Sequence, residues 1–343
     1  MRQCVGSVIP VWMPAEMPAD TVLAFLRATL ADVELFVAPE RLVLVVDGCA
    51  HAEGPARRAA DELAERAGSE PQVLVCAVNG GKGAAVCAGL ERLLQDEAVE
   101  ALNIRDCDAD HDIYDLPQLF RLFDHVRAHL RGQGSERPDD LFAVGCRGTL
   151  TRPMGAARGH LEAVLDRLTV EAVNTRLAEQ GSAVDERFTA RYGRVPDFQS
   201  GYKLYSRSAA RTVIAVLRAA DAADPNLRVM RWAVEFIPTI ELLLRGFTPA
   251  ALHRLTWDGQ PQTTFDGSDL PRAYSQQIAW LFERLSIPAG TGVRLLDNEL
   301  EACEYLASPH GPEHLAAIRA QVIERCWPDA TADEPPGRGE LFI

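Results

Sequence analysis

The first 150 residues alternate short apolar runs with longer amphipathic segments. The apolar runs are rich in Val, Leu and Ile, which is typical of buried strands, and the segments between them repeat apolar residues every three or four positions, as helices do. The predicted strands cover residues 7–12, 42–46, 73–77, 101–104 and 141–145, and the predicted helices cover residues 20–30, 55–67, 83–94 and 116–130. This alternation predicts an α/β fold: a doubly wound, mostly parallel sheet flanked by helices, with ligands at the carboxyl ends of its strands.

Beyond residue 150 the hydrophobic pattern is less regular. Residues 158–180 have the spacing of one long helix. Apolar residues at 201–205 and 248–252 predict two more strands, with a helix at 233–245 between them. Residues 270–326 are helical in pattern, and their apolar face favours core packing over a membrane-binding stripe.

These patterns divide the chain into four parts. The last residues are rich in Asp, Glu, Pro and Gly, so we expect a mobile tail. The expected parts are residues 1–150 and 151–257, as two halves of one domain, residues 258–328, as a helical C-terminal extension, and residues 329–343, as the tail.

The composition and net charge of the chain disfavour some classes of binding partner. The chain has 343 residues, 47% of them apolar, and its net charge of -14 opposes binding to nucleic acid or to an anionic membrane. Its eight cysteines form no C-x-x-C pair, which favours reduced thiols. No segment approaches the ~20 apolar residues of a transmembrane span, and the N-terminus lacks the pattern of a signal peptide. We therefore expect a cytoplasmic protein without a transmembrane span.

An acidic turn is the most informative motif. Asp106 and Asp108 follow the predicted strand at 101–104. Two carboxylates one residue apart at a strand end can hold a hard divalent cation whose other ligands are phosphate oxygens. An acidic turn that only solvates the chain end is the alternative.

Two further motifs follow neighbouring strands. Residues 79–85 open a helix, where backbone N–H groups and Lys82 favour an anion, although the spacing fits neither a Walker A loop nor G-x-G-x-x-G. Asp47 ends the second strand and could accept hydrogen bonds from a base or ribose. A turn followed by a helix start, and a plain Asp-Gly turn, are the structural alternatives.

The second half of the chain offers further polar candidates. As a strand, residues 197–203 would direct Asp197 and Lys203 to one face, as a pocket wall or as a charged edge strand. Glu235 stands among apolar residues, which would raise its pKa and suit an acid or base; a solvated helix carboxylate is the alternative. His253 could complete a metal site or simply lie on the surface.

Taken in order, these segments resemble the family 2 glycosyltransferases with a GT-A fold, most closely the polyprenyl-phosphate (dolichol-phosphate-type) sugar transferases. Residues 106–117 match the family's "DADGQHDPEDLP" pattern without a gap, and residues 79–89 match its "N-x-GKG-A-A-x-x-A-G" helix opening. Residues 197–207 resemble its "D-T-Q-C-G-F-K-L-F-S-R" stretch, whereas Val46 replaces the first Asp of its "VDDGS" strand end. The resemblance covers about residues 5–257 and departs from the family at 181–195.

The resemblance implies a metal-dependent transferase that moves a sugar from a nucleotide-diphosphate-sugar to a hydroxyl or phosphate acceptor, usually with inversion. It makes residues 1–150 the donor half and residues 151–257 the acceptor half. Mg²⁺ or Mn²⁺ would be held by Asp106, Asp108 and His253, and Asp197 and Glu235 are the catalytic candidates. The donor-binding candidates are Pro10, Asp47, Asn79, Lys82, Asp106, Lys203 and Arg207.

Several alternatives stay open. The acceptor is a small molecule or a lipid phosphate, and the oligomeric state is undecided, a homodimer included. A retaining GT-A enzyme acting on a small soluble acceptor shares the donor half, and so does a non-catalytic nucleotide-sugar binding protein. A sugar nucleotidyltransferase is disfavoured because residues 12–16 lack a Gly-rich, Arg-containing loop.

Overall fold

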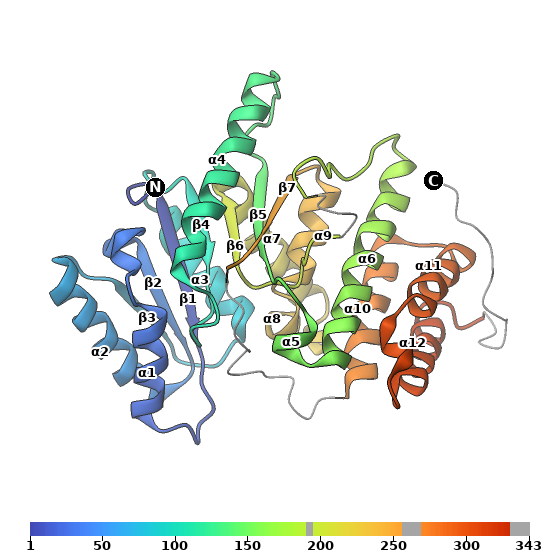
Figure 1. Cartoon of the computed structure of the whole chain (residues 1–343), viewed down its shortest axis with the longest axis horizontal. Coiled ribbons are helices and arrows are strands. Elements are labelled where there is room, and N and C mark those ends of the chain that lie inside the picture. The colour runs from blue at the N-terminus through green and yellow to red at the C-terminus, as the bar shows by residue number, and fades with distance from the viewer. Residues whose placement is uncertain (190–194, 256–268, 330–343) are drawn as a thin grey trace. The chain divides into compact units, whose positions relative to one another are not determined.

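The structure is a computed structural model that describes residues 1–189, 195–255 and 269–329 (Figure 1). The chain forms two compact units. Within the described residues, the first unit consists of residues 1–148, 185–189 and 198–255, and the second of residues 149–184, 195–197 and 269–329.

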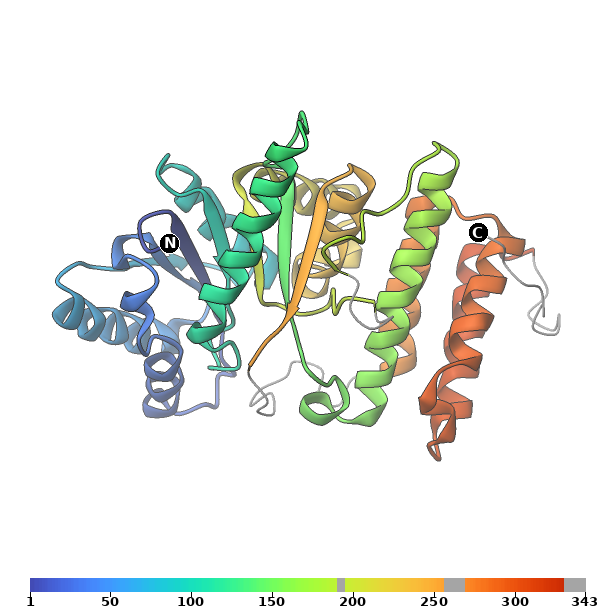
Figure 2. The ribbon, with the colours of Figure 1, turned by 45° about the horizontal axis from the view of Figure 1, so that its top comes forward.

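The first unit is built on a seven-stranded sheet. Its strands are β1 (Val5–Val11), β2 (Leu42–Asp47), β3 (Gln72–Cys76), β4 (Ala101–Ile104), β5 (Leu141–Cys146), β6 (Lys203–Ser206) and β7 (Thr248–His253). They lie in the order β3-β2-β1-β4-β6-β5-β7. Only β6 is antiparallel to its neighbours, β4 and β5, while β5 and β7 run parallel side by side (Figure 2). The predicted α/β fold with a mostly parallel sheet is therefore confirmed.

The strand order reverses beside β1. The chain adds β2 and β3 on one side of β1 and then crosses to place β4 on the other side. In doubly wound sheets, ligands bind at such a switch point, outside the carboxyl ends of the strands. The acidic turn after β4 lies at this edge.

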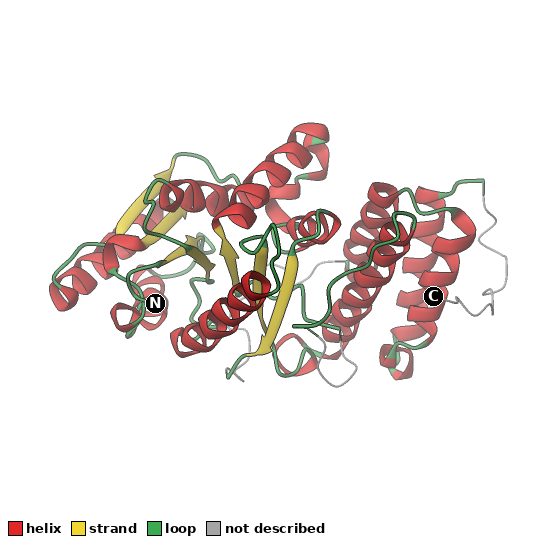
Figure 3. Ribbon diagram, turned by 90° about the horizontal axis from the view of Figure 1, so that it is seen from above, coloured by secondary structure: helices red, strands yellow, loops and turns green. Residues whose placement is uncertain are grey.

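Helices cover both faces of this sheet (Figure 3). One face packs against α1 (Ala19–Thr29), α2 (Ala50–Ala67) and α4 (Leu116–Gly132). The helices α3 (Lys82–Leu94), α7 (Arg207–Ala223), α8 (Val229–Trp232) and α9 (Phe236–Leu244) contact one another, and α3 packs on β1. Gly89 lets α3 approach closely, because a Cβ there would lie 2.3 Å from Val8 Cγ1.

The sequence pattern predicted most of these elements within three residues of their ends. The helix α2 begins at Ala50, five residues before the predicted start at Pro55. Pro55 lies inside the helix and is not its first residue. The predicted helix at 233–245 corresponds to α9, which begins three residues later at Phe236, and the short helix α8 just before it was not predicted. The helix α7 was not predicted, although Ser206 caps it by accepting a hydrogen bond from the Ala209 N–H.

The second unit is helical. It contains α5 (Thr151–Met154), α6 (Ala156–Ala178), α10 (Leu270–Leu285), α11 (Ala289–Glu301) and α12 (Gly311–Cys326). The helix α10 packs against α12 and α6, and α11 packs against α6. The C-terminal extension is thus helical, as predicted, and α6 groups with it. The predicted boundary at residue 257 and the predicted tail after residue 329 lie outside the described residues.

Within the same described ranges, no helix combines the length and the apolarity that crossing a membrane requires.

Candidate functional site

Three charged side chains meet at the carboxyl edge of the sheet in the first unit. Asp106 comes after β4, Lys82 begins α3, and Glu235 precedes α9. The Lys82 Nζ lies 2.7 Å from Asp106 Oδ1 and 2.6 Å from Glu235 Oε1. The side chains are 20–28% exposed, so a ligand can reach them. We call Lys82, Asp106 and Glu235 the lysine triad.

Lys82 and Asp106 are both ionised. Burial opposes the charge of Lys82, but Asp106 and Glu235 outweigh this effect and raise the pKa of Lys82 above its ordinary range. Burial likewise opposes ionisation of Asp106, and Lys82 overcomes it, so the pKa of Asp106 is lowered. The site thus holds permanent charge at neutral pH.

The loop before Lys82 is held by Asp47. Its two carboxylate oxygens accept hydrogen bonds from the N–H groups of Gly80 and Gly81, each at 2.8 Å, and Asn79 Oδ1 accepts a further bond from Gly81 N–H at 3.1 Å. Gly81 has φ of 91°, a conformation that favours glycine. Asp47 and Asn79, which the sequence predicted to bind the donor, therefore shape the loop that presents Lys82.

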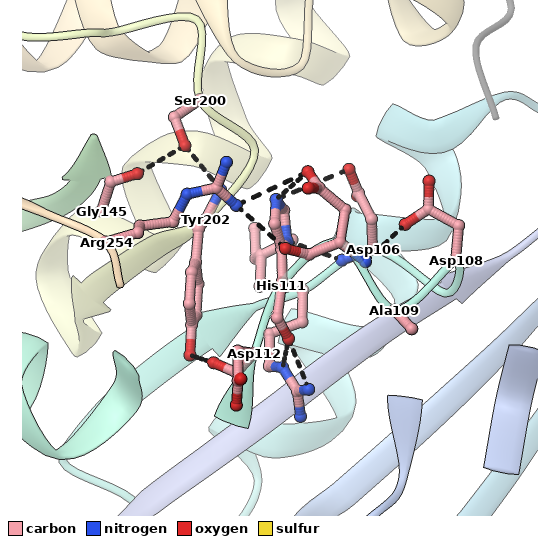
Figure 4. A network of polar contacts seen from close by, with 12 residues as sticks. Asp106, Asp108, Ala109, His111, Asp112, Gly145, Ser200, Tyr202 and Arg254 are labelled. Carbon is pink, nitrogen blue, oxygen red and sulfur yellow. Dashed lines mark hydrogen bonds and ion pairs between the residues drawn. The ribbon is translucent and has the colours of Figure 1, made fainter. Parts of the chain in front are cut away.

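The acidic turn is supported by His111. Its Nδ1 accepts a hydrogen bond from Asp106 N–H at 2.9 Å, so the ring proton sits on Nε2 and faces the carboxylates of Asp106 and Asp110 (Figure 4). Burial lowers the pKa of His111 well below its usual range, so the ring is neutral. The Tyr202 ring stacks on it with centroids 4.9 Å apart. These contacts fix the backbone that carries Asp106.

Two buried arginines complete this network, and neither was predicted from the sequence. Arg105 donates to the carbonyl oxygens of His111 and Thr29. Arg254, just after β7, places Nη1 3.6 Å from Asp110 Oδ2. The Arg254 Nε is buried and has no hydrogen-bond partner among the described residues. Asp110 and Arg254 are 144 residues apart in the chain, so the local pattern around either residue carries no signal for this pair.

Asp108 lies on the same turn in a different environment. It is 8% exposed, and its Oδ1 accepts a hydrogen bond from Asp110 N–H at 3.2 Å. Burial and the nearby charge of Asp106 raise its pKa to about 7. Ala109, the next residue, has φ of 66°, a strained value for a residue other than glycine, and its N–H donates to Thr29 Oγ1. The turn is therefore held in one shape.

The turn can be tested for its fit to a divalent cation. Across residues 1–189, 195–255 and 269–329, His, Cys, Asp and Glu form no group of three or more that could hold a metal ion. Asp106 already pairs with Lys82, which leaves Asp108 as the carboxylate available on the turn. Mg²⁺ is commonly held by one or two carboxylates together with substrate phosphates and water. The donor set fits a cation that shares its ligands with a phosphate-bearing substrate.

The predicted roles of Lys203 and Arg207 need correction. Lys203 is buried, and its Nζ donates to the carbonyl oxygens of Phe198 and Ser200, so it stabilises a turn. Arg207 donates to carbonyl oxygens just before β4, at the end opposite Asp106. The cause is the antiparallel direction of β6, which pairs Ser206 with the first residue of β4.

Three of the predicted site residues remain: Pro10, Asp197 and His253. His253 is exposed at the end of β7, and no described hydrogen bond or ion pair joins it to the acidic turn. Pro10 is buried within β1, opposite Val45 of β2. Asp197 is buried and belongs to the second unit. Of the predicted site, the structure brings together Lys82, Asp106, Asp108 and Glu235, with Asp47 and Asn79 holding the adjoining loop.

No protein-family model matches the chain, and no curated protein matches its sequence.

Proposed function

We propose that the protein is a glycosyltransferase that uses a nucleotide-diphosphate-sugar together with Mg²⁺ or Mn²⁺. The observation that carries this proposal is the lysine triad beside Asp108 at the switch point of the sheet. The Lys82 ammonium could bind a phosphate oxygen, and Asp108 could hold a cation that the diphosphate shares. The resemblance of residues 79–89 and 106–117, which contain these residues, to family 2 GT-A enzymes agrees with this reaction class.

The proposed reaction exchanges one bond at the anomeric carbon of the sugar. The bond to the diphosphate oxygen breaks while a bond to the acceptor oxygen forms. A bound cation would stabilise the negative charge that the leaving diphosphate gains. Two ammonium hydrogens of Lys82 point to Asp106 and Glu235, and the third remains for a phosphate oxygen. Arg254, with its unpaired Nε, brings a second positive charge to the turn.

The mechanism depends on whether the acceptor carries a proton that must be removed during transfer. A hydroxyl acceptor must lose its proton to a base, whereas an ionised phosphate acceptor has none to lose. Glu235 is a poor base as it stands, because its carboxylate is paired with Lys82 at 2.6 Å. This pairing favours a phosphate acceptor.

A non-catalytic nucleotide-sugar binding protein is the second candidate. The same pairing favours it, because Glu235 is engaged by Lys82 and so is not free to act as a base. Donor binding without sugar transfer or hydrolysis, tested with phosphate and hydroxyl acceptors, would support this candidate over the enzyme.

The proposal is tested by a binding and hydrolysis screen of UDP-, GDP-, ADP- and dTDP-sugars, with and without Mn²⁺ or Mg²⁺. We expect metal-dependent binding of one donor, and loss of that binding in Asp108→Asn. Asp112→Asn is the matched control, since it removes an exposed charge from the same turn and keeps an oxygen to cap the Tyr114 N–H. Failure of every donor to bind the wild-type protein would refute the proposal.

A further inference from the structure

Lys82 occupies the position between two carboxylates where a metal ion would otherwise be expected. Its ammonium lies 2.7 Å from Asp106 Oδ1 and 2.6 Å from Glu235 Oε1, and these residues come from separate elements of the first unit. Two carboxylates around one centre attract a divalent cation when nothing else balances their charge. Here the chain supplies a positive charge of its own, which offsets one of the two negative charges.

The surroundings hold Lys82 in this position. A Cβ at Gly201 would lie 3.0 Å from Lys82 Nζ and 3.1 Å from Asp106 Oδ2, so the backbone of Gly201 closes one side of the pair. A Cβ at Gly83 would lie 3.0 Å from Met230 Cα, so α3 starts in close contact with α8. The Asp47 carboxylate holds the preceding loop. These contacts fix the backbone that carries Lys82 and close one side of its ammonium group.

We propose that Lys82 acts as a built-in cation that prevents a divalent ion from binding Asp106 and Glu235, so that the ion binds only together with the diphosphate of the substrate. This inference deepens the proposed function, on which its second part rests. Without a diphosphate, a divalent ion could be coordinated by Asp108 and water but would be repelled by the charge of Lys82. A diphosphate brings oxygen ligands for the ion and an acceptor for the third Lys82 hydrogen.

The proposal predicts that removing the lysine creates a metal site. In Lys82→Met, Asp106 and Glu235 lose the positive charge between them, and Asp108 lies two residues after Asp106 on the same turn. Mn²⁺ should bind this variant without any nucleotide, at least about tenfold more tightly than it binds the wild type, because the change removes one positive charge beside two negative ones.

The experiment measures Mn²⁺ bound to the full chain by water proton relaxation enhancement, with and without pyrophosphate. We expect the wild type to bind Mn²⁺ well only when pyrophosphate is present, and Lys82→Met to bind Mn²⁺ alone. Lys82→Arg is the control, because it keeps the positive charge and should bind Mn²⁺ alone as weakly as the wild type. A rise in the melting temperature of Lys82→Met on adding Mn²⁺ would provide a second measurement.

Two results would overturn the inference: wild-type protein that binds Mn²⁺ alone as tightly as with pyrophosphate, or a folded Lys82→Met that gains no Mn²⁺ affinity. If Lys82→Met does not fold, the wild-type comparison still decides. The Lys82→Met measurement involves no donor, so it separates the two proposals. If Lys82→Met gained Mn²⁺ affinity but the wild type bound no nucleotide-sugar, the glycosyltransferase proposal would be refuted. The proposal that Lys82 excludes a divalent ion would still hold.

Discussion

Each unit of the molecule sets two carboxylates around one cation, and the outcomes differ. In the first unit Lys82 contacts both Asp106 and Glu235, and the pKa of Asp106 is lowered although burial opposes this. In the second unit Arg167 of α6 pairs with Glu299 of α11.

Glu171, one turn after Arg167, is a carboxylate whose nearby cation is engaged elsewhere. Burial and the charge of Glu299 raise the pKa of Glu171 to about 7, and Arg167 lowers it only in part. Lys82 thus keeps Asp106 ionised by direct contact, whereas Arg167 is paired with Glu299 and leaves Glu171 to titrate near neutral pH.

The largest expected effect comes from Lys82→Met, which would turn the first arrangement into uncompensated charge. Removing one partner of a buried ion pair costs ~3–5 kcal/mol, and partial exposure reduces this to about 2–3 kcal/mol here. Urea unfolding at pH 7 without metal measures the loss. Lys82→Arg should lose less, and an unchanged unfolding midpoint in Lys82→Met would show that the triad contributes nothing.

Asp47→Asn tests the support beneath the same cation. An amide has one acceptor oxygen in place of two, so Gly80 or Gly81 would lose its hydrogen bond to residue 47, at about 1–2 kcal/mol. Gly81 N–H would keep its bond to Asn79 Oδ1. Urea unfolding measures this loss. Affinity for the donor identified by the screen should fall as well, because the loop carries Lys82. If Asp47→Asn kept the stability of the wild type but no longer bound the donor, Asp47 would instead contact the donor directly.

Gly201→Ala would crowd the pair that Lys82 and Asp106 form. The new methyl group would lie 3.0–3.2 Å from Lys82, Asp106 and His111, and such overpacking costs about 1–3 kcal/mol where neighbours cannot move, and about 1 where the lysine end yields. Thermal unfolding measures it. Gly290→Ala is the matched control: its Cβ meets open space at the start of α11, so that variant should be as stable as the wild type or more so. Equal melting temperatures for the two variants would contradict the close packing around Gly201.

The smallest expected effect is on the pH dependence of stability, and it comes from the ionisation of Glu171. Its pKa is about 7 in the folded protein against an ordinary value of 4.5, so the folded state keeps a proton that the unfolded chain loses between these values. Stability should therefore fall as pH rises from about 4.5 to 7 and then level off, by roughly 1 kcal/mol after solvent screening is allowed for.

Glu171→Gln removes that proton exchange. The unfolding midpoint in urea, compared between pH 5 and pH 8, should fall less in this variant than in the wild type. Equal pH dependence in both proteins would show that Glu171 ionises normally.

Local patterns in the sequence were enough to predict the class of fold and the acidic turn. The strand at 101–104 was predicted to the residue, and the helix that Lys82 opens to within one residue, because both depend on side-chain periodicity and on glycines at a strand end. Asp106 and Asp108 could be singled out because they directly follow a buried strand.

The partners of these residues were decided by tertiary structure alone. Lys82 meets Glu235, and Asp110 meets Arg254, across more than a hundred residues. Periodicity along the chain carries no record of which strand ends will be neighbours, since that depends on strand order and direction. The antiparallel β6 shows this most clearly: it places Arg207 at the far end of β4 from Asp106, although the sequence had suggested that Arg207 binds the donor.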